Sequence, residues 1–245
     1  MGQILGFGKL ALAATLVAVA AAAHADSPVT VVVPGQANPW LAGLPDGATA
    51  SFTDVAPGQS PVLVPGLALV AGTVVQFLNV TGGTLNMDGC PGVCIGAEGD
   101  PSLYGYTVRA DFAGYPDGEN GIGNVLAPFG ALLGVYLGAD LPTSTAAPAT
   151  MDFQSTATGL NFTTLSPGLK QVFFIGNGMT DSGVLQSFAV PTGATRLYLG
   201  TLDGFGWSNN TGELALDVSA VPEPATGWMA LIGLAGLATA LTRRR

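Results

Sequence analysis

The chain has 245 residues, of which only 9% are charged while 36 are glycine and 17 are proline, a composition that argues against disorder and for a β-rich domain with many turns. Between residues 26 and 223 there are 16 acidic and 3 basic residues, a net charge of −13, which argues against nucleic acid as a partner because phosphate contacts need Lys and Arg. The same acidity suits a hard cation such as calcium, although it also serves simply to keep a protein in solution.

Residues 1–25 have the pattern of a cleaved signal peptide. One lysine precedes an apolar run over residues 10–22, and the small-x-small sequence at 23–25 is a cleavage site that leaves Asp26 as the first residue. The run is shorter than the roughly 20 residues that a spanning helix needs, although an uncleaved membrane helix is the alternative. We therefore expect an exported protein.

The segment 26–219 is predicted to form one all-β domain, a β-sandwich or jelly roll. Its short runs rich in Val, Phe and Leu, bounded by Gly, Pro, Asn or Asp, are typical of strands, and no long stretch has helical periodicity. The stretch 139–150, rich in Pro, Thr and Ala, is a loop and not a domain boundary, because neither side alone has enough strands. The predicted strands are 29–33, 67–70, 74–80, 131–137, 171–175, 185–190, 196–199 and 213–218.

Cys90 and Cys94 enclose the sequence Cys-Pro-Gly-Val-Cys. Two cysteines in an exported chain most often form one disulfide, and because this loop is short, such a bond would mainly fix one turn. The spacing is one residue longer than the redox motif Cys-x-x-Cys, and a free or redox-active pair is the alternative.

The mature chain has no histidine, because the single one, His24, lies in the signal peptide. That excludes Ser-His-Asp and Cys-His catalysis as well as histidine metal ligands. A glycosidase needs only two carboxylates, and Asp111, Asp117 and Glu119 lie close together in sequence, but their glycine-rich stretch is typical of a solvated loop. We therefore predict that the protein is not an enzyme.

Oxygen-bearing side chains gather in the loop between the predicted strands 196–199 and 213–218. The loop contains Asp203, Asn209 and Asn210, together with glycines that let its backbone curl. One carboxylate with amide and backbone oxygens suits calcium. Asp, Asn and Gly also form hairpin turns with no ion, so the residues alone leave both interpretations open.

This loop resembles the C-terminal part of the PA-IL-type galactose-binding lectin domain, a small β-sandwich that holds sugar through calcium. In that family an Asp and a short loop precede Asn-Asn-x-Gly before the last strand, and Asp203, Asn209, Asn210 and Gly212 stand at these positions. The resemblance implies that Asp203, Asn209 and Asn210 are calcium ligands.

The family's sugar-contacting His-Pro-Asp-Gln run has its nearest counterpart in residues 115–118, Tyr-Pro-Asp-Gly. The resemblance implies ligand-binding roles for Tyr115 and Asp117, while the loss of His and Gln implies calcium binding with galactose binding altered or absent. Tyr115, Trp40 and Trp207 are candidates for the planar face of a sugar site, but burial in the core is the favoured interpretation of each, because large apolar side chains are mostly buried.

The C-terminus combines the sequence Val-Pro-Glu-Pro at 221–224 with an apolar run at 225–242 and three final arginines. As a helix, the run rises about 27 Å, which is just enough to cross the hydrocarbon core of a bilayer. Arginines stay on the cytoplasmic side, so the main domain is expected outside the membrane.

The order Pro-Glu-Pro, transmembrane helix and terminal arginines resembles the PEP-CTERM sorting signal, here assigned to residues 220–245. In that family the tripeptide, here Pro222, Glu223 and Pro224, is the recognition site of an exosortase, a membrane protease-transpeptidase of Gram-negative bacteria that make exopolysaccharide. The resemblance implies an envelope or biofilm-matrix protein that is membrane-anchored before processing. An ordinary C-terminal anchor is the alternative, and it also places the domain outside the cell.

The predicted function is that of an exported envelope or matrix protein with a non-catalytic, calcium-dependent carbohydrate-binding domain. Its expected partners are an exosortase, the membrane and a polysaccharide. The alternative is a purely structural matrix protein that binds no small molecule.

Overall fold

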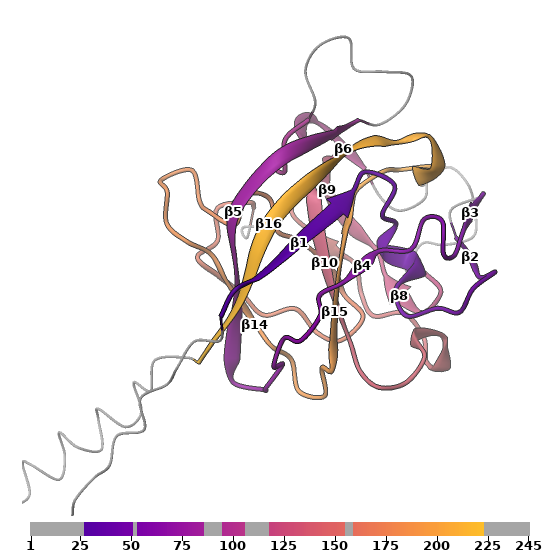
Figure 1. Cartoon of the computed structure of the whole chain (residues 1–245), viewed down its shortest axis with the longest axis horizontal. Helices are drawn as coiled ribbons and strands as arrows, with labels where there is room; N and C mark the ends of the chain where they lie inside the picture. Colours follow the sequence, from indigo (N-terminus) through magenta and orange to yellow (C-terminus); the bar gives the residue numbers. More distant parts are fainter. Residues whose placement is uncertain (1–26, 51–52, 86–94, 106–117, 155–158, 223–245) are drawn as a thin grey trace, which may run out of the picture.

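Strands carry almost all the regular structure in the computed structural model, which describes residues 27–50, 53–85, 95–105, 118–154 and 159–222 (Figure 1). The helices of this part of the chain are single 3₁₀ turns: η1 (Pro39–Leu41), η2 (Pro142–Ser144) and η3 (Trp207–Asn209). The prediction of an all-β domain is confirmed, and the arrangement of its sheets is consistent with a β-sandwich. The predicted signal peptide and the predicted helix at 225–242 lie outside the described residues.

The larger sheet has five strands in the order β1-β16-β5-β14-β12. The long strand β16 lies between β1 and β5 and is antiparallel to both. Along β1, Val31 and Val33 are buried while Val32 is exposed, which is the alternation of a strand with one face on the core. The strands are β1 (Val29–Pro34), β5 (Thr73–Leu85), β12 (Thr164–Leu165), β14 (Ser187–Ala189) and β16 (Thr211–Pro222).

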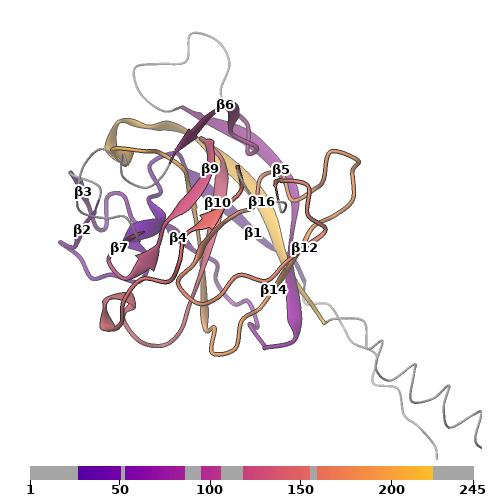
Figure 2. The ribbon, with the colours of Figure 1, turned by 180° about the vertical axis from the view of Figure 1, so that it is seen from behind.

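The second sheet has the order β13-β10-β15-β4, and a third has the order β11-β9-β6. Every residue of β10 is buried, as its continuous apolar sequence requires. Two short hairpins, β2–β3 and β7–β8, complete the described part of the fold, and Figure 2 shows the second from behind. These strands are β2 (Thr49–Ala50), β3 (Asp54–Val55), β4 (Val62–Leu63), β6 (Asp100–Gly105), β7 (Gly118–Glu119), β8 (Ile122–Gly123), β9 (Val125–Phe129), β10 (Leu132–Leu137), β11 (Met151–Asp152), β13 (Val172–Phe174) and β15 (Arg196–Thr201).

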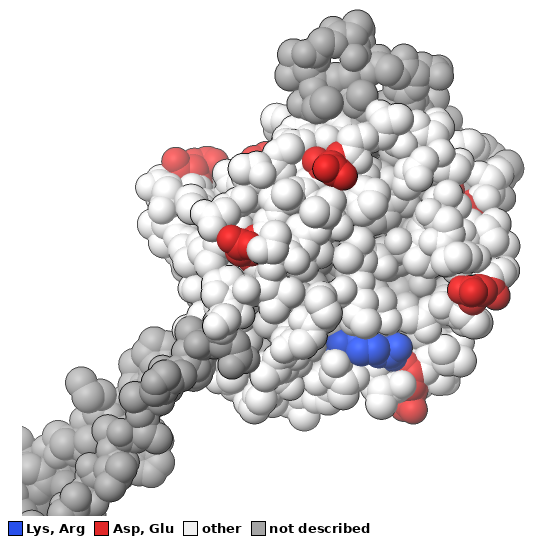
Figure 3. All heavy atoms as spheres, viewed as in Figure 1, with Lys and Arg blue, Asp and Glu red and all other residues white. Residues whose placement is uncertain are grey.

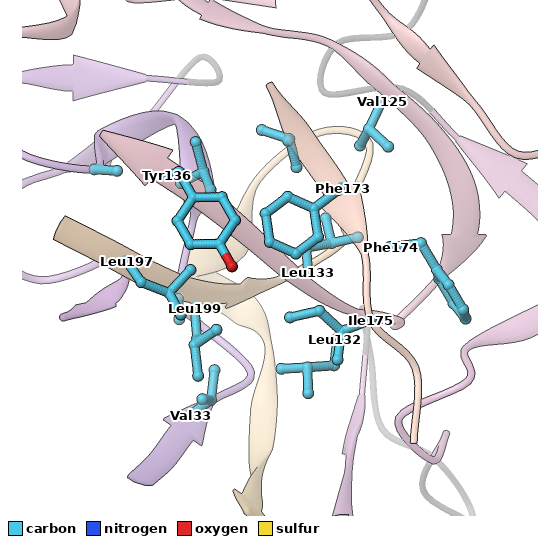
Figure 4. Close-up of a cluster of buried hydrophobic side chains, with 14 of the residues drawn as sticks. Val33, Val125, Leu132, Leu133, Tyr136, Phe173, Phe174, Ile175, Leu197 and Leu199 are labelled. Carbon is cyan, nitrogen blue, oxygen red and sulfur yellow. The ribbon is translucent and has the colours of Figure 1, made fainter. Parts of the chain in front are cut away.

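The core lies between the larger sheet and the second sheet (Figure 4). Tyr136 of β10 stacks on Phe173 of β13 with ring centroids 5.3 Å apart, and Phe173 in turn lies 5.5 Å from Phe188 of the larger sheet. Phe188 meets Phe77 edge-on at 5.0 Å. This chain of aromatic contacts joins the two sheets, and burial of each ring removes about 150–250 Å² from water.

Most of the predicted strands overlap observed ones, but the strand predicted at 67–70 is wrong. These residues form an irregular loop between β4 and β5, and the neighbouring strand is β4, Val62–Leu63. Ala68 and Val70 in this run are exposed, so its apolar composition does not reflect burial on a sheet. The stretch 139–150 is a loop, as predicted, with η2 inside it.

The two ends of the described chain lie at the same end of the larger sheet. Val29, the first residue of β1, is opposite Val218, and Pro222, the last residue of β16, is opposite Thr73, the first residue of β5. Figure 1 shows the start of β1, the start of β5 and the end of β16 together. The sheet therefore continues directly into the segment that carries the predicted sorting sequence.

Candidate cation-binding loop and sorting motif

The predicted cation loop connects β15 to β16 and contains η3. Asp203 and Asn210 are buried, with 4% and 1% of their surfaces exposed, while Asn209 is exposed. The structure therefore brings two of the three predicted ligands into the interior and leaves Asn209 facing solvent.

Asp203 and Asn210 each have one side-chain oxygen that accepts no hydrogen bond from the described residues. The Oδ1 atom of Asp203 accepts from the backbone N–H of Phe205 at 3.0 Å, and its Oδ2 atom has no donor. The Nδ2 atom of Asn210 donates to the carbonyl of Gly35 at 3.0 Å, and its Oδ1 atom has no donor. A buried oxygen without a partner costs about 1–3 kcal/mol, so this pair calls for a positive group or a proton.

Burial raises the pKa of Asp203, because the charged carboxylate loses its water. The backbone N–H groups of Phe205, Gly204 and Gly206 and the side chain of Asn210 offset this pKa rise only in part. Asn210 thus lies close enough to the carboxyl group to lower its pKa, while its Nδ2 atom donates to the carbonyl of Gly35. Turning the Asn210 amide over would place its oxygen against the Gly35 carbonyl, so rotation does not resolve the mismatch.

A second buried acid, Asp54 of β3, holds the loop from the other side and was not singled out from the sequence. Its Oδ2 atom accepts from Asn38 Nδ2 and from the backbone N–H of Trp207, both at 3.0 Å, and its Oδ1 atom accepts from the N–H of Ser208 at 3.1 Å. Asp54 is fully buried, and burial raises its pKa although all three hydrogen bonds act in the opposite direction. Asp54 therefore fixes the start of η3 to the β2–β3 hairpin.

Trp40 and Trp207 are core residues. Both are fully buried, with ring centroids 5.6 Å apart, and their indole N–H groups donate to the carbonyls of Gly123 and Thr201. The favoured interpretation, core packing, is confirmed for both, and neither offers an exposed face to a sugar. Both polar tips are satisfied inside the fold, as buried Trp residues require.

The remaining predicted site residues have different outcomes. Tyr115 and Asp117, the cysteines Cys90 and Cys94, and Glu223 and Pro224 lie outside the described residues. Glu119 is only 8% exposed in the β7–β8 hairpin, so the expectation that it belongs to a solvated loop is wrong. Among the residues that the structure describes, no three His, Cys, Asp or Glu side chains gather as a metal cluster.

A calcium ion in this loop would need both a carboxylate and an amide ligand, together with backbone or water oxygens. Asp203 supplies one carboxylate oxygen and Asn210 one amide oxygen, both buried and both without a donor. Calcium takes 6–8 oxygens, typically including backbone carbonyls and waters, so the two side chains would provide part of a shell. The donor set is all oxygen, as calcium prefers.

Pro222, the first residue of the Pro-Glu-Pro tripeptide, is the last residue of β16. Val221 is opposite Val74 and Pro222 is opposite Thr73 in the larger sheet. Pro lacks an N–H and is suited to the end of a strand, where no further ladder bond is needed. In the described residues, no helix is long and apolar enough to cross a membrane, and the segment 225–242 lies beyond them.

Residues 220–245 match the family model for the PEP-CTERM protein-sorting motif. This motif indicates an exported protein of the cell envelope that is associated with the membrane before processing. The motif further implies that an exosortase sorts and processes it. Comparisons with curated proteins and with solved structures give no match, so the lectin resemblance of the 203–212 segment gains no support from them.

Proposed function

We propose that the domain in front of the sorting motif is a non-catalytic binding domain whose 203–210 loop holds one calcium ion. The observation that carries this proposal is the pair of buried oxygens without donors, Asp203 Oδ2 and Asn210 Oδ1. A cation between them would satisfy both and would favour the charged form of Asp203, whose pKa burial raises.

The ion would order a loop that displays an apolar ring and an amide to solvent. Phe205 is 42% exposed two residues after Asp203, and Asn209 is exposed next to Asn210. Sugar sites combine a planar apolar face with a few polar groups that fix orientation. A polysaccharide of the cell surface is therefore the ligand that we propose for this loop, with Phe205 taking the place expected for Tyr115 or Trp207.

A purely structural matrix protein is the second candidate, and the burial of Trp40 and Trp207 favours it. Both large aromatic rings of the loop region serve the core, which leaves Phe205 as the exposed ring beside the proposed ion. In this second function, the ion would stabilise the domain and no sugar would bind.

Thermal unfolding in calcium and in chelator tests the cation. An ion that binds only the folded state at a hundredfold excess over its dissociation constant adds about 2.7 kcal/mol of stability. At about 2–4 °C per kcal/mol for a domain of this size, the midpoint should rise by about 5–10 °C.

Asp203→Asn should abolish this rise, since the amide keeps the shape of the side chain but not its charge. The control Asp46→Asn, at an exposed position, should keep the full rise. If calcium does not shift the wild-type midpoint, the 203–210 loop is an ordinary turn whose two oxygens share a proton.

A further inference from the structure

The loop of residues 65–72 is unusually apolar for a connection at the surface. Its sequence is Pro-Gly-Leu-Ala-Leu-Val-Ala-Gly, without a single polar side chain. Leu67 and Leu69 pack partly against the core, whereas Val70 is 57% exposed, the largest value among the exposed large apolar side chains of the described residues. Surface loops of acidic soluble proteins are normally polar, so this composition points to a contact outside the folded domain.

The loop is held firmly at the start of β5. The backbone N–H and the hydroxyl of Thr73 both donate to the carbonyl of Val70, at 3.0 and 2.7 Å. On the other side, Val64 donates its N–H to the Leu197 carbonyl at 2.9 Å, where β4 ends. Val70 is thus presented by a loop that is fixed at both of its ends.

The same loop lies at the end of the sheet from which the chain leaves for the membrane. Thr73 follows the loop directly and is opposite Pro222, and the predicted transmembrane segment begins at Ala225. Three residues reach at most about 11 Å, at 3.6 Å per extended residue. The end of β16 therefore stays within about 11 Å of the bilayer surface as long as the chain is anchored.

The segments that meet at this end contain no charged residue, although the domain is strongly acidic. No Asp, Glu, Lys or Arg occurs in the segments 27–33, 64–80, 186–195 and 218–222, which meet there. In Figure 3 the surface beside the start of β5 is white, and the acidic side chains and one basic group lie elsewhere on that face. An uncharged end avoids repulsion by anionic lipids and the cost of dehydrating charges at the interface.

We propose that the 65–72 loop rests on the bilayer while the protein is anchored, with Val70 inserted at the boundary between headgroups and acyl chains. One small apolar loop binds a membrane weakly by itself, but the anchor keeps it at a high effective concentration beside the bilayer. The contact orients the domain with its larger sheet end-on to the membrane. This proposal rests on the sorting motif and does not depend on the proposed calcium or sugar binding.

Tryptophan fluorescence in vesicles tests the contact. The chain that retains its C-terminal segment is purified from cells lacking an exosortase and is placed in phosphatidylethanolamine–phosphatidylglycerol vesicles with acyl chains brominated near the carbonyl end. Val70→Trp should lose more fluorescence to the bromine atoms than the wild-type chain, whose own Trp residues give the background. Ala68→Trp, at an exposed position in the same loop, provides a second reporter that does not depend on Val70.

Val184→Trp is the matched control, because Val184 is 48% exposed in the loop before β14. Gly178 of that loop lies against the carbonyl of Phe77, which is four residues into β5 and therefore about 13 Å along the strand from Thr73. The tryptophan in this control should add fluorescence that bromine does not quench. Equal quenching of the Val70→Trp and Val184→Trp chains, or quenching at wild-type level in both loop variants, would overturn the proposal.

Discussion

Replacing Asp54 tests whether one buried acid holds the proposed cation loop in place. Asp54→Ala removes the acceptor of Trp207 N–H and Asn38 Nδ2, which are both buried, and of Ser208 N–H, which is only partly buried. Two buried donors that lose an acceptor cost roughly 2–6 kcal/mol. We expect a loss of about 3 kcal/mol, in the lower part of that range, because the change also removes the cost of burying a carboxylate.

Asp54→Asn is the matched comparison at the same site. Its amide oxygen can take the place of Oδ2 and keep two of the three hydrogen bonds, while its amide N–H₂ group faces the donor of Ser208. The expected loss is therefore about 1 kcal/mol. Exposed Asp46→Ala should change stability by less than about 0.5 kcal/mol.

Urea unfolding of residues 26–222 measures these differences, and the corresponding fall in midpoint temperature for Asp54→Ala is about 6–12 °C. The segment ends at Pro222 so that β16 is complete. Two results would refute the reasoning: an alanine variant within about 1 kcal/mol of wild type, or an asparagine variant as unstable as the alanine one.

Three further predictions follow from other parts of the structure. The Glu98 carboxylate accepts a hydrogen bond from the backbone N–H of Asn177 at 2.7 Å, yet burial and the charge of Asp181 raise the pKa of Glu98 above its usual 4.5. The contribution of Glu98 to folding stability is therefore full below pH 4.5 and declines as the pH rises through the folded-state pKa. The Glu98→Gln variant should therefore be more stable than wild type at pH 7 and equally stable below pH 4.5, as measured by unfolding at both pH values. The same difference in stability between variant and wild type at both pH values would contradict this. A Cβ atom at Gly134 would lie 2.5 Å from the Phe173 ring, so Gly134→Ala should cost about 1–3 kcal/mol in the same assay, whereas Gly96→Ala, with open space around its Cβ, should be neutral. Phe205→Ala should weaken retention on immobilised surface polysaccharide in calcium, whereas Val184→Ala should not; unchanged retention would favour the structural matrix function.

The larger features of the fold could be predicted from sequence because local patterns encode them. The continuous apolar run at 131–137 marks β10, whose residues are all buried, and the alternation at 213–218 marks the centre of β16. The run at 67–70 has similar composition but pairs with no strand: Leu67 and Leu69 pack only partly against the core, while Ala68 and Val70 are exposed. Composition alone cannot separate a buried strand from a loop that turns apolar side chains outward.

The proposed cation loop was only partly predictable for a related reason. Asp203 and Asn210 could be found because both lie in one short loop that also contains glycines. Asp54 could not, because the backbone groups it holds are 153 and 154 residues away in sequence. The exposure of Asn209 and the burial of Trp207 also depend on how η3 turns, which contacts with distant segments decide.

The place of β16 in the larger sheet sets the order in which the protein can mature. β1 and β5 do not pair with each other and are joined only through β16, which ends at Pro222. A chain that crosses the membrane N-terminus first delivers β16 last, so until nearly all of the exported domain has emerged β1 has no partner strand and β5 has only β14. Completion of the sheet and arrival of the sorting tripeptide at the outer surface are therefore the same event, and an exosortase meets its substrate at the moment when the domain can first fold.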